Sequence, residues 1–410
     1  GFQGATTDNP YALRIDEQPT VDPTTLACTP RSGLGVEGGS PSGAPVGSAA
    51  GIVFTNWDRV PGDTAGAEAA LASVAASEGL AVVPVGSVLG VSGLYGDWDA
   101  APCDPDAANA IVDALTAWVQ DQVGSNPGIR TVTLLGGDEA IPFARLADTT
   151  AIANEQTYAP TFGDSALYGA LATRHYLSDA PYGDLDPVAW LDRHAYVPEL
   201  GVGRVVETGE DVETALTTFS ANGGVLDLET ATVAGYDFLT DGSNEVLAAL
   251  DDYVDSTTSA ISETWTANDL GGLLAGNPDV ASPNAHYDHY RLLPASENLA
   301  GTETDLFEIA DLLGIDPTTD LVFTMGCHAG LNVPDGVGTA TEFGDWAQTY
   351  GSLNAVYVAN TGYGYGDTAT VALSEEVMAN FAANLTGELN VGLALAQAQQ
   401  DQFTKAGIYG

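Results

Sequence analysis

The segment LVFTMGCHAG, residues 321–330, is the most informative part of this chain. An apolar, β-branched run stops abruptly at Gly326 and Cys327, and small residues follow. This pattern is typical of a buried parallel strand. Such a strand would leave the thiol of Cys327 at the carboxyl edge of a sheet, which is the edge where open α/β folds bind their ligands.

A second strand-like run lies about 40 residues upstream, where DVASPNA (279–285) is followed by His286. A thiol and an imidazole at adjacent strand ends are the two groups that catalysis by a cysteine nucleophile requires. His286 is therefore the predicted base, and His289, one short turn later, is the alternative base. Side chains alternate along a strand, so His328, directly after Cys327, is expected to point away from the thiol.

The remainder of the chain alternates between strand-like and helix-like segments. In the first series, strands are expected at 51–57, 80–85 and 131–135, and helices at 64–78 and near 105–123. Asp104 followed by Pro105 is typical of a helix start. In the second series, strands are expected at 231–239, 261–265, 279–286, 320–327 and 354–361, and helices at 243–260, about 340–350, 370–385 and 391–404.

This alternation predicts an α/β fold with two tandem parallel-sheet subdomains and helices on both faces of each sheet. Residues 1–50 are rich in Pro, Thr and Gly and predict an irregular N-terminal segment or linker. The expected divisions are then an N-terminal α/β subdomain at 51–228 and a catalytic α/β subdomain at 229–410.

The charge of the chain is extreme, since 56 acidic residues against 10 basic ones give a net charge of −46. Nucleic acid is excluded as a partner because the clustered Lys and Arg that neutralise phosphates are absent. No run reaches the ~18 apolar residues of a membrane-spanning helix, and an anionic membrane surface would repel the chain. Acidic residues spread along a chain with a single lysine resemble the composition of proteins from extreme halophiles.

The chain has three cysteines, Cys28, Cys103 and Cys327. If Cys327 is a working thiol, Cys28 and Cys103 form one candidate disulfide, which would indicate an oxidising compartment; the alternative is two unpaired thiols. No charged-then-apolar signal peptide opens the chain, which is expected of a mature, processed or fragmentary polypeptide.

Several motifs, in their order along the chain, resemble the gingipain-type cysteine peptidases, family C25 of the caspase-like clan. The resemblance includes the Gly-Cys-His-Ala-Gly strand end and the Asn-Ala-His strand end described above. It extends to LLGGDEAIPF (134–143), SDAPYGDLD (178–186) with LGVGR (200–204), and VYVANTGYGYG (356–366). It covers about residues 50–404, and it implies a caspase-like fold and a secreted or cell-surface cysteine endopeptidase.

The resemblance also implies roles for individual residues. Cys327 would be the nucleophile, His286 the general base and then acid, and the amides of Cys327 and Tyr287 the oxyanion hole. In the segment GYDFLTDG (235–242), Asp237 would orient His286, and Asp241 would line a pocket for a basic P1 side chain. The family usually has Gly where Tyr287 stands, and this difference leaves open both that oxyanion donor and the choice between His286 and His289.

Peptide hydrolysis of this kind needs no cofactor, and no metal site is predicted. The carboxylates of Asp184 and Asp186 could bind a structural calcium ion, but such turn residues are common and no site is assigned. The expected partner is a protein or peptide substrate, and the sequence does not indicate an oligomeric state. The expected location is an extracellular or cell-surface environment of high salt.

Three other functions fit parts of the pattern. The first is a non-catalytic surface or adhesion module of a halophile envelope that keeps the fold without the chemistry. The second is a metal-dependent hydrolase that uses His286, Asp288 and His289. The third is an acidic structural component of a halophile envelope.

Overall fold

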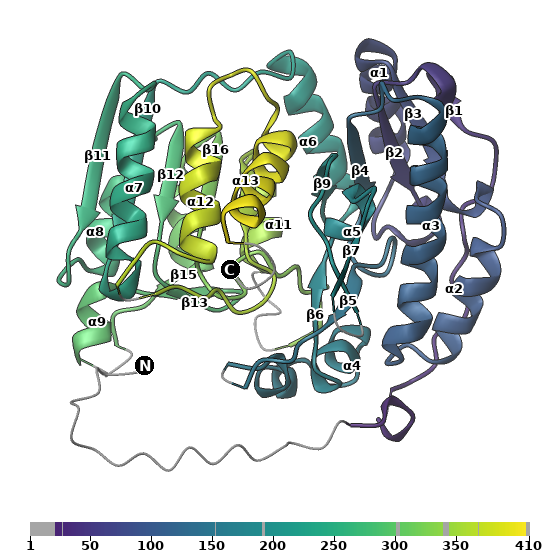
Figure 1. Cartoon of the computed structure of the whole chain (residues 1–410), viewed down its shortest axis with the longest axis horizontal. Helices are drawn as coiled ribbons and strands as arrows, with labels where there is room; N and C mark the ends of the chain where they lie inside the picture. The colour runs from purple at the N-terminus through teal and green to yellow at the C-terminus, as the bar shows by residue number, and fades with distance from the viewer. Residues whose placement is uncertain are drawn as a thin grey trace.

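The computed structural model describes residues 21–26, 28–151, 153–190, 193–300, 304–338, 344–367 and 369–406. Two five-stranded sheets with helices on both faces lie side by side in this part of the chain (Figure 1). The prediction of an α/β fold with two tandem parallel sheets is confirmed. The first sheet lies within residues 42–205 and the second within 230–359, so the predicted boundary at 228/229 falls between them; the exact subdomain limits stay a prediction.

The first sheet has the strand order β1-β3-β2-β4-β9. The strands β2 (Gly51–Thr55), β3 (Leu80–Pro84) and β4 (Thr131–Leu135) pair in parallel, and all three were expected from short apolar runs. The edge strand β9 (Gly201–Val205) pairs in parallel with β4 and was not predicted as a strand. The edge strand β1 (Ser42–Gly43) pairs antiparallel with β3. The segment 1–50 is therefore not irregular throughout. Residues 1–20 of it lie outside the described residues.

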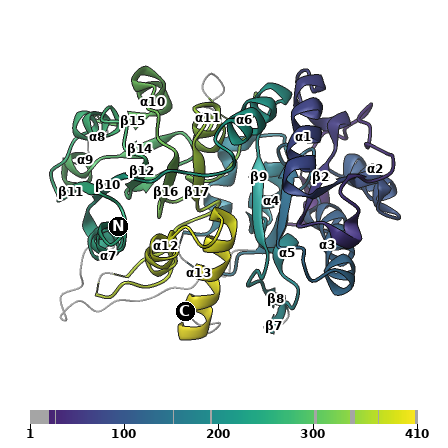
Figure 2. The same ribbon diagram turned by 90° about the horizontal axis from the view of Figure 1, so that it is seen from above.

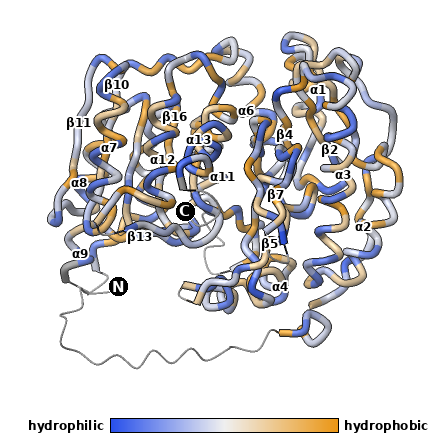
Figure 3. The backbone as a smooth tube through the Cα atoms, in the orientation of Figure 1, coloured by the Kyte–Doolittle hydropathy of each residue, from blue (hydrophilic) through white to orange (hydrophobic). Residues whose placement is uncertain are grey.

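Helices cover both faces of the first sheet. On one face α1 (Ala65–Glu78) and α6 (Gly209–Ala221) pack together over β2, β3 and β4 through Val53, Leu71 and Val212. On the other face lie α2 (Val91–Ala100) and α3 (Pro105–Ser125), with Trp98 and Leu115 fully buried. Hydrophobic and hydrophilic residues are interspersed along these helices (Figure 3).

The second sheet has the order β11-β10-β12-β16-β17, and all its pairings are parallel. Its strands are β10 (Thr230–Gly235), β11 (Ser256–Ile261), β12 (Val280–Pro283), β16 (Leu321–Thr324) and β17 (Val356–Ala359). The three inner strands β10, β12 and β16 are largely or wholly buried, as parallel strands with both faces covered must be. The segment that ends at Cys327 is thus next to the edge strand β17.

Two groups of helices cover the second sheet. On one face lie α7 (Thr240–Asp251), α12 (Ser374–Ala383) and α13 (Val391–Ala406), and on the other lie α8 (Ala267–Leu274), α10 (Ile309–Ile315) and α11 (Trp346–Ser352). A small antiparallel sheet lies beside these helices and has three strands: β13 (His286–Tyr287), β14 (Arg291–Leu293) and β15 (Phe307–Glu308). The helix α9 (Ala295–Ala300) lies between β14 and β15 in the sequence.

The two sheets are joined through helices of the second unit that contact elements of the first. α13 packs against α12 of the second unit and against β9 of the first, and α11 contacts α6 (Figure 2). Gly201 of β9 and Gly392 of α13 meet so closely that a Cβ on Gly201 would lie 2.8 Å from the backbone nitrogen of Leu393. The last helix of the chain therefore ties the second half to the first.

Some expected elements were wrong. The helix expected at 243–260 ends at Asp251, and residues 256–261 form the edge strand β11 instead of the strand expected at 261–265. The segment STTSAI consists of small and β-branched residues that fit a strand beside β10, whereas a longer helix would have left that edge unpaired. α2 and α8 were not expected. Part of the helix expected at 340–350 lies outside the described residues, and α11 begins at Trp346.

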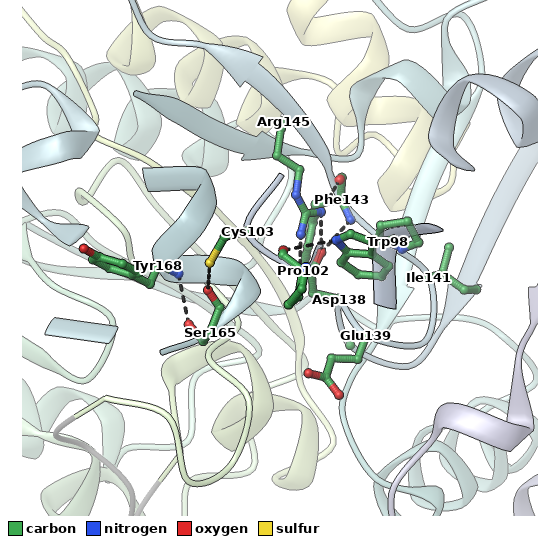
Figure 4. A network of polar contacts seen from close by, with 12 residues as sticks. Trp98, Pro102, Cys103, Asp138, Glu139, Ile141, Phe143, Arg145, Ser165 and Tyr168 are labelled. Carbon is green, nitrogen blue, oxygen red and sulfur yellow. Dashed lines mark hydrogen bonds and ion pairs between the residues drawn. The ribbon is translucent and has the colours of Figure 1, made fainter. Parts of the chain in front are cut away.

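Several arginines of the first half are internal. Arg145 lies against Asp138 with 2.6 Å between Nη2 and Oδ2, and both side chains are almost fully buried (Figure 4). Arg59 pairs with Asp99, and Arg204 with Asp179 at 2.7 Å. The guanidinium of Arg145 also lies over the Trp98 ring. Since few basic residues remain outside, the surface carries almost unopposed negative charge.

Cys28 and Cys103 form a disulfide with 5.9 Å between their Cα atoms, which confirms the candidate pairing. It ties the segment before β1 to the turn between α2 and α3. Among the helices of the described residues, none combines the length and hydropathy needed to span a lipid bilayer.

Candidate active site

Cys327 stands at the carboxyl end of β16, in the turn that leaves the sheet. The strand ends of β12 and β16 are held together beyond their paired residues: Thr324 Oγ1 donates to Pro283 O at 2.6 Å, and Met325 N donates to Asn284 Oδ1 at 3.2 Å. The two chain segments predicted to carry the thiol and the imidazole therefore leave the sheet side by side.

Tyr287 forms the direct contact between these segments. A Cβ on Gly326 would lie 2.2 Å from Cδ2 of the Tyr287 ring, so only glycine leaves room for that ring next to Cys327. His286 immediately precedes Tyr287, and its backbone nitrogen donates to Tyr236 Oη at 3.2 Å. Cys327 directly follows Gly326, and His286 directly precedes Tyr287. The thiol and the imidazole therefore belong to residues that are adjacent in sequence to the packed Gly326 and Tyr287.

His286 pairs with the carboxylate predicted to orient it. The distance from His286 Nε2 to Asp237 Oδ2 is 3.7 Å, and the two side chains are 36% and 47% exposed, so both groups are reachable from solvent. Burial of the ring lowers the pKa of His286, while Asp237 partly offsets that decrease. Asp237 has a positive φ of 55°, and its backbone nitrogen donates to Glu263 Oε1 at 2.8 Å. The structure brings His286 and Asp237 together.

The thiol of Cys327 contacts the segment that follows β17. Its Sγ lies 3.6 Å from Gly364 O, and the hydrogen bonds of the described residues include none between this sulfur and a histidine nitrogen. Burial raises the pKa of Cys327; hydrogen bonds with Gly364 and with its own backbone amide lower it, and the Glu155 charge raises it further. The thiol is therefore held in its neutral form here.

Phe238 connects the thiol segment to His286. Its ring centroid lies 5.6 Å from that of His286, and a Cβ on Gly366 would lie 2.7 Å from the same ring. Gly366 is two residues from Gly364, which contacts the thiol. The aromatic rings of Tyr287 and Phe238 thus link the surroundings of Cys327 and His286 at this edge of the second sheet.

His289, the alternative base, lies in a closed cluster. The side chain is fully buried, and its Nδ1 is 2.5 Å from Tyr158 Oη. Burial, with smaller contributions from the charges of His328 and Arg291, lowers the pKa of His289 to about 3. Its contacts with Tyr158 and Phe162 place the ring against the first half of the chain, away from solvent.

His328 is also turned toward the first half of the chain. Its Nε2 lies 2.8 Å from Glu155 Oε2, and both side chains are buried. Glu155 was not singled out in the sequence, because it lies in the irregular connection of the first half and only the tertiary structure brings it to the residue after Cys327.

Asp241, the predicted pocket carboxylate, lies in the first turn of α7. It is close to Glu375 of α12, a fully buried residue whose Oε2 accepts the backbone N–H of Asp367 at 3.0 Å. Burial, and secondarily the nearby Asp241, raises the pKa of Glu375 to about 7. A Cβ on Gly366 would lie 2.9 Å from Cδ of Glu375, so this carboxyl pair lies near Phe238 and the thiol segment. Glu375 is a second acidic residue here that the sequence did not indicate.

A shallow surface pocket lies beside His286, lined by Tyr287, Asp288, Arg291, Leu293 and Leu306 as well as His286 itself. Asp288 in this pocket binds Arg291 with 2.7 Å between Oδ2 and Nε. Within the described residues, no group of three or more His, Cys, Asp or Glu side chains has an arrangement that could hold a metal ion.

No protein-family model matches the chain, and no curated protein matches it either. Among solved structures, it is similar to the complex of the RgpB pro- and mature domains of Porphyromonas gingivalis (14% identity, TM-score 0.43). It is also similar to the Arg-specific cysteine proteinase gingipain R, RgpB (13%, 0.44), and to a protease (11%, 0.47). The alignments cover 72%, 72% and 84% of this chain and 65%, 64% and 75% of those chains. The chain therefore spans less than two thirds of the length of the first two.

Proposed function

We propose that this protein is a cysteine endopeptidase in which Cys327 is the nucleophile and His286 the general base. One observation carries the proposal: Gly326, next to the thiol, packs on Tyr287, next to a partly exposed imidazole that is paired with Asp237. A nucleophile, a base and a group that orients the base are the parts that acyl transfer by a thiol requires. The sequence resemblance to gingipain-type peptidases assigns the same three residues.

In the proposed reaction, His286 takes the proton of the thiol, and the sulfur attacks the carbonyl carbon of the scissile peptide bond. The tetrahedral oxyanion collapses, the C–N bond breaks, and the imidazolium of His286 protonates the leaving amine. Water, deprotonated by His286, then hydrolyses the thioester and releases the carboxylic acid and the thiol. The 3.6 Å contact of the sulfur with Gly364 must give way to the imidazole when substrate binds, since catalytic contacts often tighten only in the complex.

The backbone amides of Cys327 and Tyr287 are the proposed oxyanion donors. Asp288 N donates to Arg291 O across the β13–β14 hairpin at 3.0 Å. N–H groups alternate in direction along an antiparallel ladder, so the N–H of Tyr287 faces away from β14. A side chain at this position does not block a backbone donor, and one such donor contributes roughly 3–4 kcal/mol in acyl-transfer enzymes.

The proposed substrate is a protein or peptide with a basic P1 residue. Asp241 and Glu375 supply two carboxyl groups near the thiol segment, and a lysine or arginine side chain would relieve their mutual repulsion. Asp241 is the proposed specificity residue. No cofactor takes part in this scheme.

Labelling of the thiol tests the nucleophile and base together. A peptidyl chloromethyl ketone with a P1 arginine should alkylate Cys327 in the wild type. The variants Cys327→Ala and His286→Ala should lose labelling and peptide cleavage, because one lacks the nucleophile and the other the base. His194→Ala is the matched control, since His194 lies on β8 (Arg193–Ala195) in the first half of the chain. Labelling of Cys327 that does not depend on His286 would contradict the proposed dyad.

The non-catalytic surface or adhesion module is the second candidate. It is favoured by the neutral, partly buried state of the thiol and by its contact with a carbonyl instead of an imidazole. That function predicts a folded protein that cleaves no peptide and in which the chloromethyl ketone reacts no faster than iodoacetamide.

We also propose that the protein works outside the cell or on its surface, in high salt. The disulfide between Cys28 and Cys103 supports an oxidising compartment, and the net charge of −46 supports a medium that screens charge.

A further inference from the structure

Glu155 is a buried carboxylate that the proposed mechanism does not use. It begins the short helix η5 (Glu155–Thr157) in the first half of the chain, and it is only 2% exposed. Its backbone nitrogen donates to Asp148 Oδ2 at 2.8 Å, which fixes the start of this turn. A carboxylate is costly to bury unless specific partners compensate the lost water. The groups that bind the Glu155 carboxylate therefore indicate why it is buried.

Those partners lie on the two segments that flank the thiol. Glu155 Oε2 lies 2.8 Å from His328 Nε2, and His328 directly follows Cys327. Glu155 Oε1 accepts the backbone N–H of Tyr363 at 2.9 Å, and Tyr363 directly precedes Gly364, whose carbonyl contacts the thiol. One carboxylate from the first half of the chain thus forms hydrogen bonds with both segments that contain or contact Cys327.

His328 is fixed in a conformation that a non-glycine residue rarely adopts. Its φ is 53°, and its backbone nitrogen donates to Gly362 O at 2.8 Å. Tyr158 stacks on its ring with 3.8 Å between centroids, and Tyr363 approaches its edge at 4.4 Å. A left-handed residue persists only where its surroundings hold it, and such residues gather at functional sites. The hydrogen bond with Glu155 is the polar part of that support.

Several charged and titratable groups surround the pair. The His328 ring contacts Glu155, Tyr158 and Tyr363. His289 Nδ1 contacts the Tyr158 hydroxyl, Asp148 Oδ2 accepts the backbone N–H of Glu155, and Tyr365 interacts electrostatically with Glu155 and Cys327. The ionisation of these groups, besides that of Cys327, contributes to a pH profile.

We infer that Glu155 is a positioning residue for Cys327: by holding His328 and Tyr363 at once, it orients the thiol, and it makes activity depend on the first α/β half of the chain. The inference rests on the proposed role of Cys327 as nucleophile.

The full-length protein with Glu155→Ala, Glu155→Gln or Glu207→Ala provides the test. Glu207 is the matched control, because it is also a buried acid of the first half whose side chain forms hydrogen bonds with the second half. It accepts Asp335 N at 3.0 Å and Asn332 Nδ2 at 3.3 Å, and its hydrogen bonds in the described residues include none with His328 or Tyr363. Peptide cleavage gives kcat and KM, and the rate of iodoacetamide alkylation against pH reports Cys327 without any need for turnover.

Glu155→Ala should lower kcat roughly 10–100-fold with a smaller change in KM, because a misplacement of about 1 Å is enough for such a loss. Glu155→Gln should retain much of kcat, since an amide can still bond both partners. In both variants the midpoint of the alkylation profile should move to lower pH, because the Glu155 charge raises the pKa of Cys327. Glu207→Ala should leave the alkylation midpoint in place.

The inference is overturned if Glu155→Ala and Glu207→Ala reduce kcat equally, or if neither Glu155 variant moves the alkylation midpoint. If Glu155→Ala does not fold, the Gln variant still decides through its midpoint. A wild-type protein that cleaves no peptide, yet whose alkylation midpoint shifts in the Glu155 variants, would reject the peptidase function while it upholds the control of the thiol by Glu155.

Discussion

The thiol of Cys327 is positioned by its immediate neighbours more than by its own side chain. Gly326 admits the Tyr287 ring where any Cβ would collide with it, and His328 turns the chain with a positive φ. A buried thiol is disfavoured as an anion, so the raised pKa of Cys327 follows from the same packing. In the proposed mechanism, activation requires that the partly exposed His286 ring reach the sulfur.

Asp241 is the residue proposed to determine specificity for the P1 side chain. Asp241→Asn removes the partly exposed carboxylate of the Asp241–Glu375 pair. We expect kcat/KM for a P1-Arg substrate to fall roughly 10–100-fold, because a hydrogen bond to a charged group contributes about 1.5–3 kcal/mol. A P1-Ala substrate should change little. A panel of otherwise identical P1-Arg, P1-Lys and P1-Ala peptides measures this.

Glu245→Gln is the matched control, because Glu245 is an exposed acid on the same helix α7. It should leave the panel unchanged. Equal cleavage of all three peptides by the wild type would exclude Asp241 from the pocket.

Among the secondary-structure elements, the helix α11 is capped at its N-terminus by a buried acid. Asp345 caps α11 by accepting Gln348 N at 2.8 Å, and it is fully buried beside Asn332 and Glu207. Burial, the largest effect, raises the pKa of Asp345 to about 7. An acid whose folded pKa is raised stabilises the fold when it is protonated, and that stability is lost as pH rises from the unfolded pKa toward 7.

We therefore expect the wild type to lose stability between pH 5 and pH 8, with Asp345 contributing on the order of 2 kcal/mol of the decrease. Asp345→Asn keeps an N-cap acceptor but cannot ionise, so its decrease should be smaller by that amount. Urea unfolding at both pH values measures the difference. Asp104→Asn, at the partly exposed cap of α3, should leave the wild-type decrease in place. If Asp345→Asn keeps the full decrease, Asp345 is not its source.

Element types were predicted well where the periodicity was strong. β2, β4 and β16 are apolar runs bounded by glycine or polar residues, and α3 has Asp104 and Pro105 at its start. The segment 256–261 was mistaken because its burial pattern belongs to a partly exposed edge strand, which shows no apolar run. Edge strands are defined by their partner, and here that partner is β10.

At the scale of the whole molecule, charge is distributed unevenly between inside and outside. Arg59, Arg145 and Arg204 are used in internal ion pairs, so the net charge of −46 is expressed at the surface. Repulsion among these acids opposes compaction, and salt shortens its range from ~8 Å at 0.15 M to ~3 Å at 1 M.

The Tm should consequently rise steeply with NaCl or KCl between dilute buffer and molar concentrations. Sucrose at matched osmolality separates charge screening from general solute exclusion, and it should raise Tm less than either salt. Differential scanning calorimetry provides the measurement. A Tm that does not change with salt would show that the surface acids do not oppose folding.

Much of the architecture was contained in the chain itself: apolar runs and helix starts predict two parallel sheets, because local periodicity requires burial on particular faces. The same apolar runs also predicted that Cys327 lies at the end of one strand and His286 at the end of the neighbouring strand. The tertiary structure alone decided that Glu155 meets His328, that Glu375 lies beside Asp241, and that α13 of the second half packs against β9 of the first. These contacts join residues far apart in sequence, and no local pattern encodes which distant surfaces will pack together.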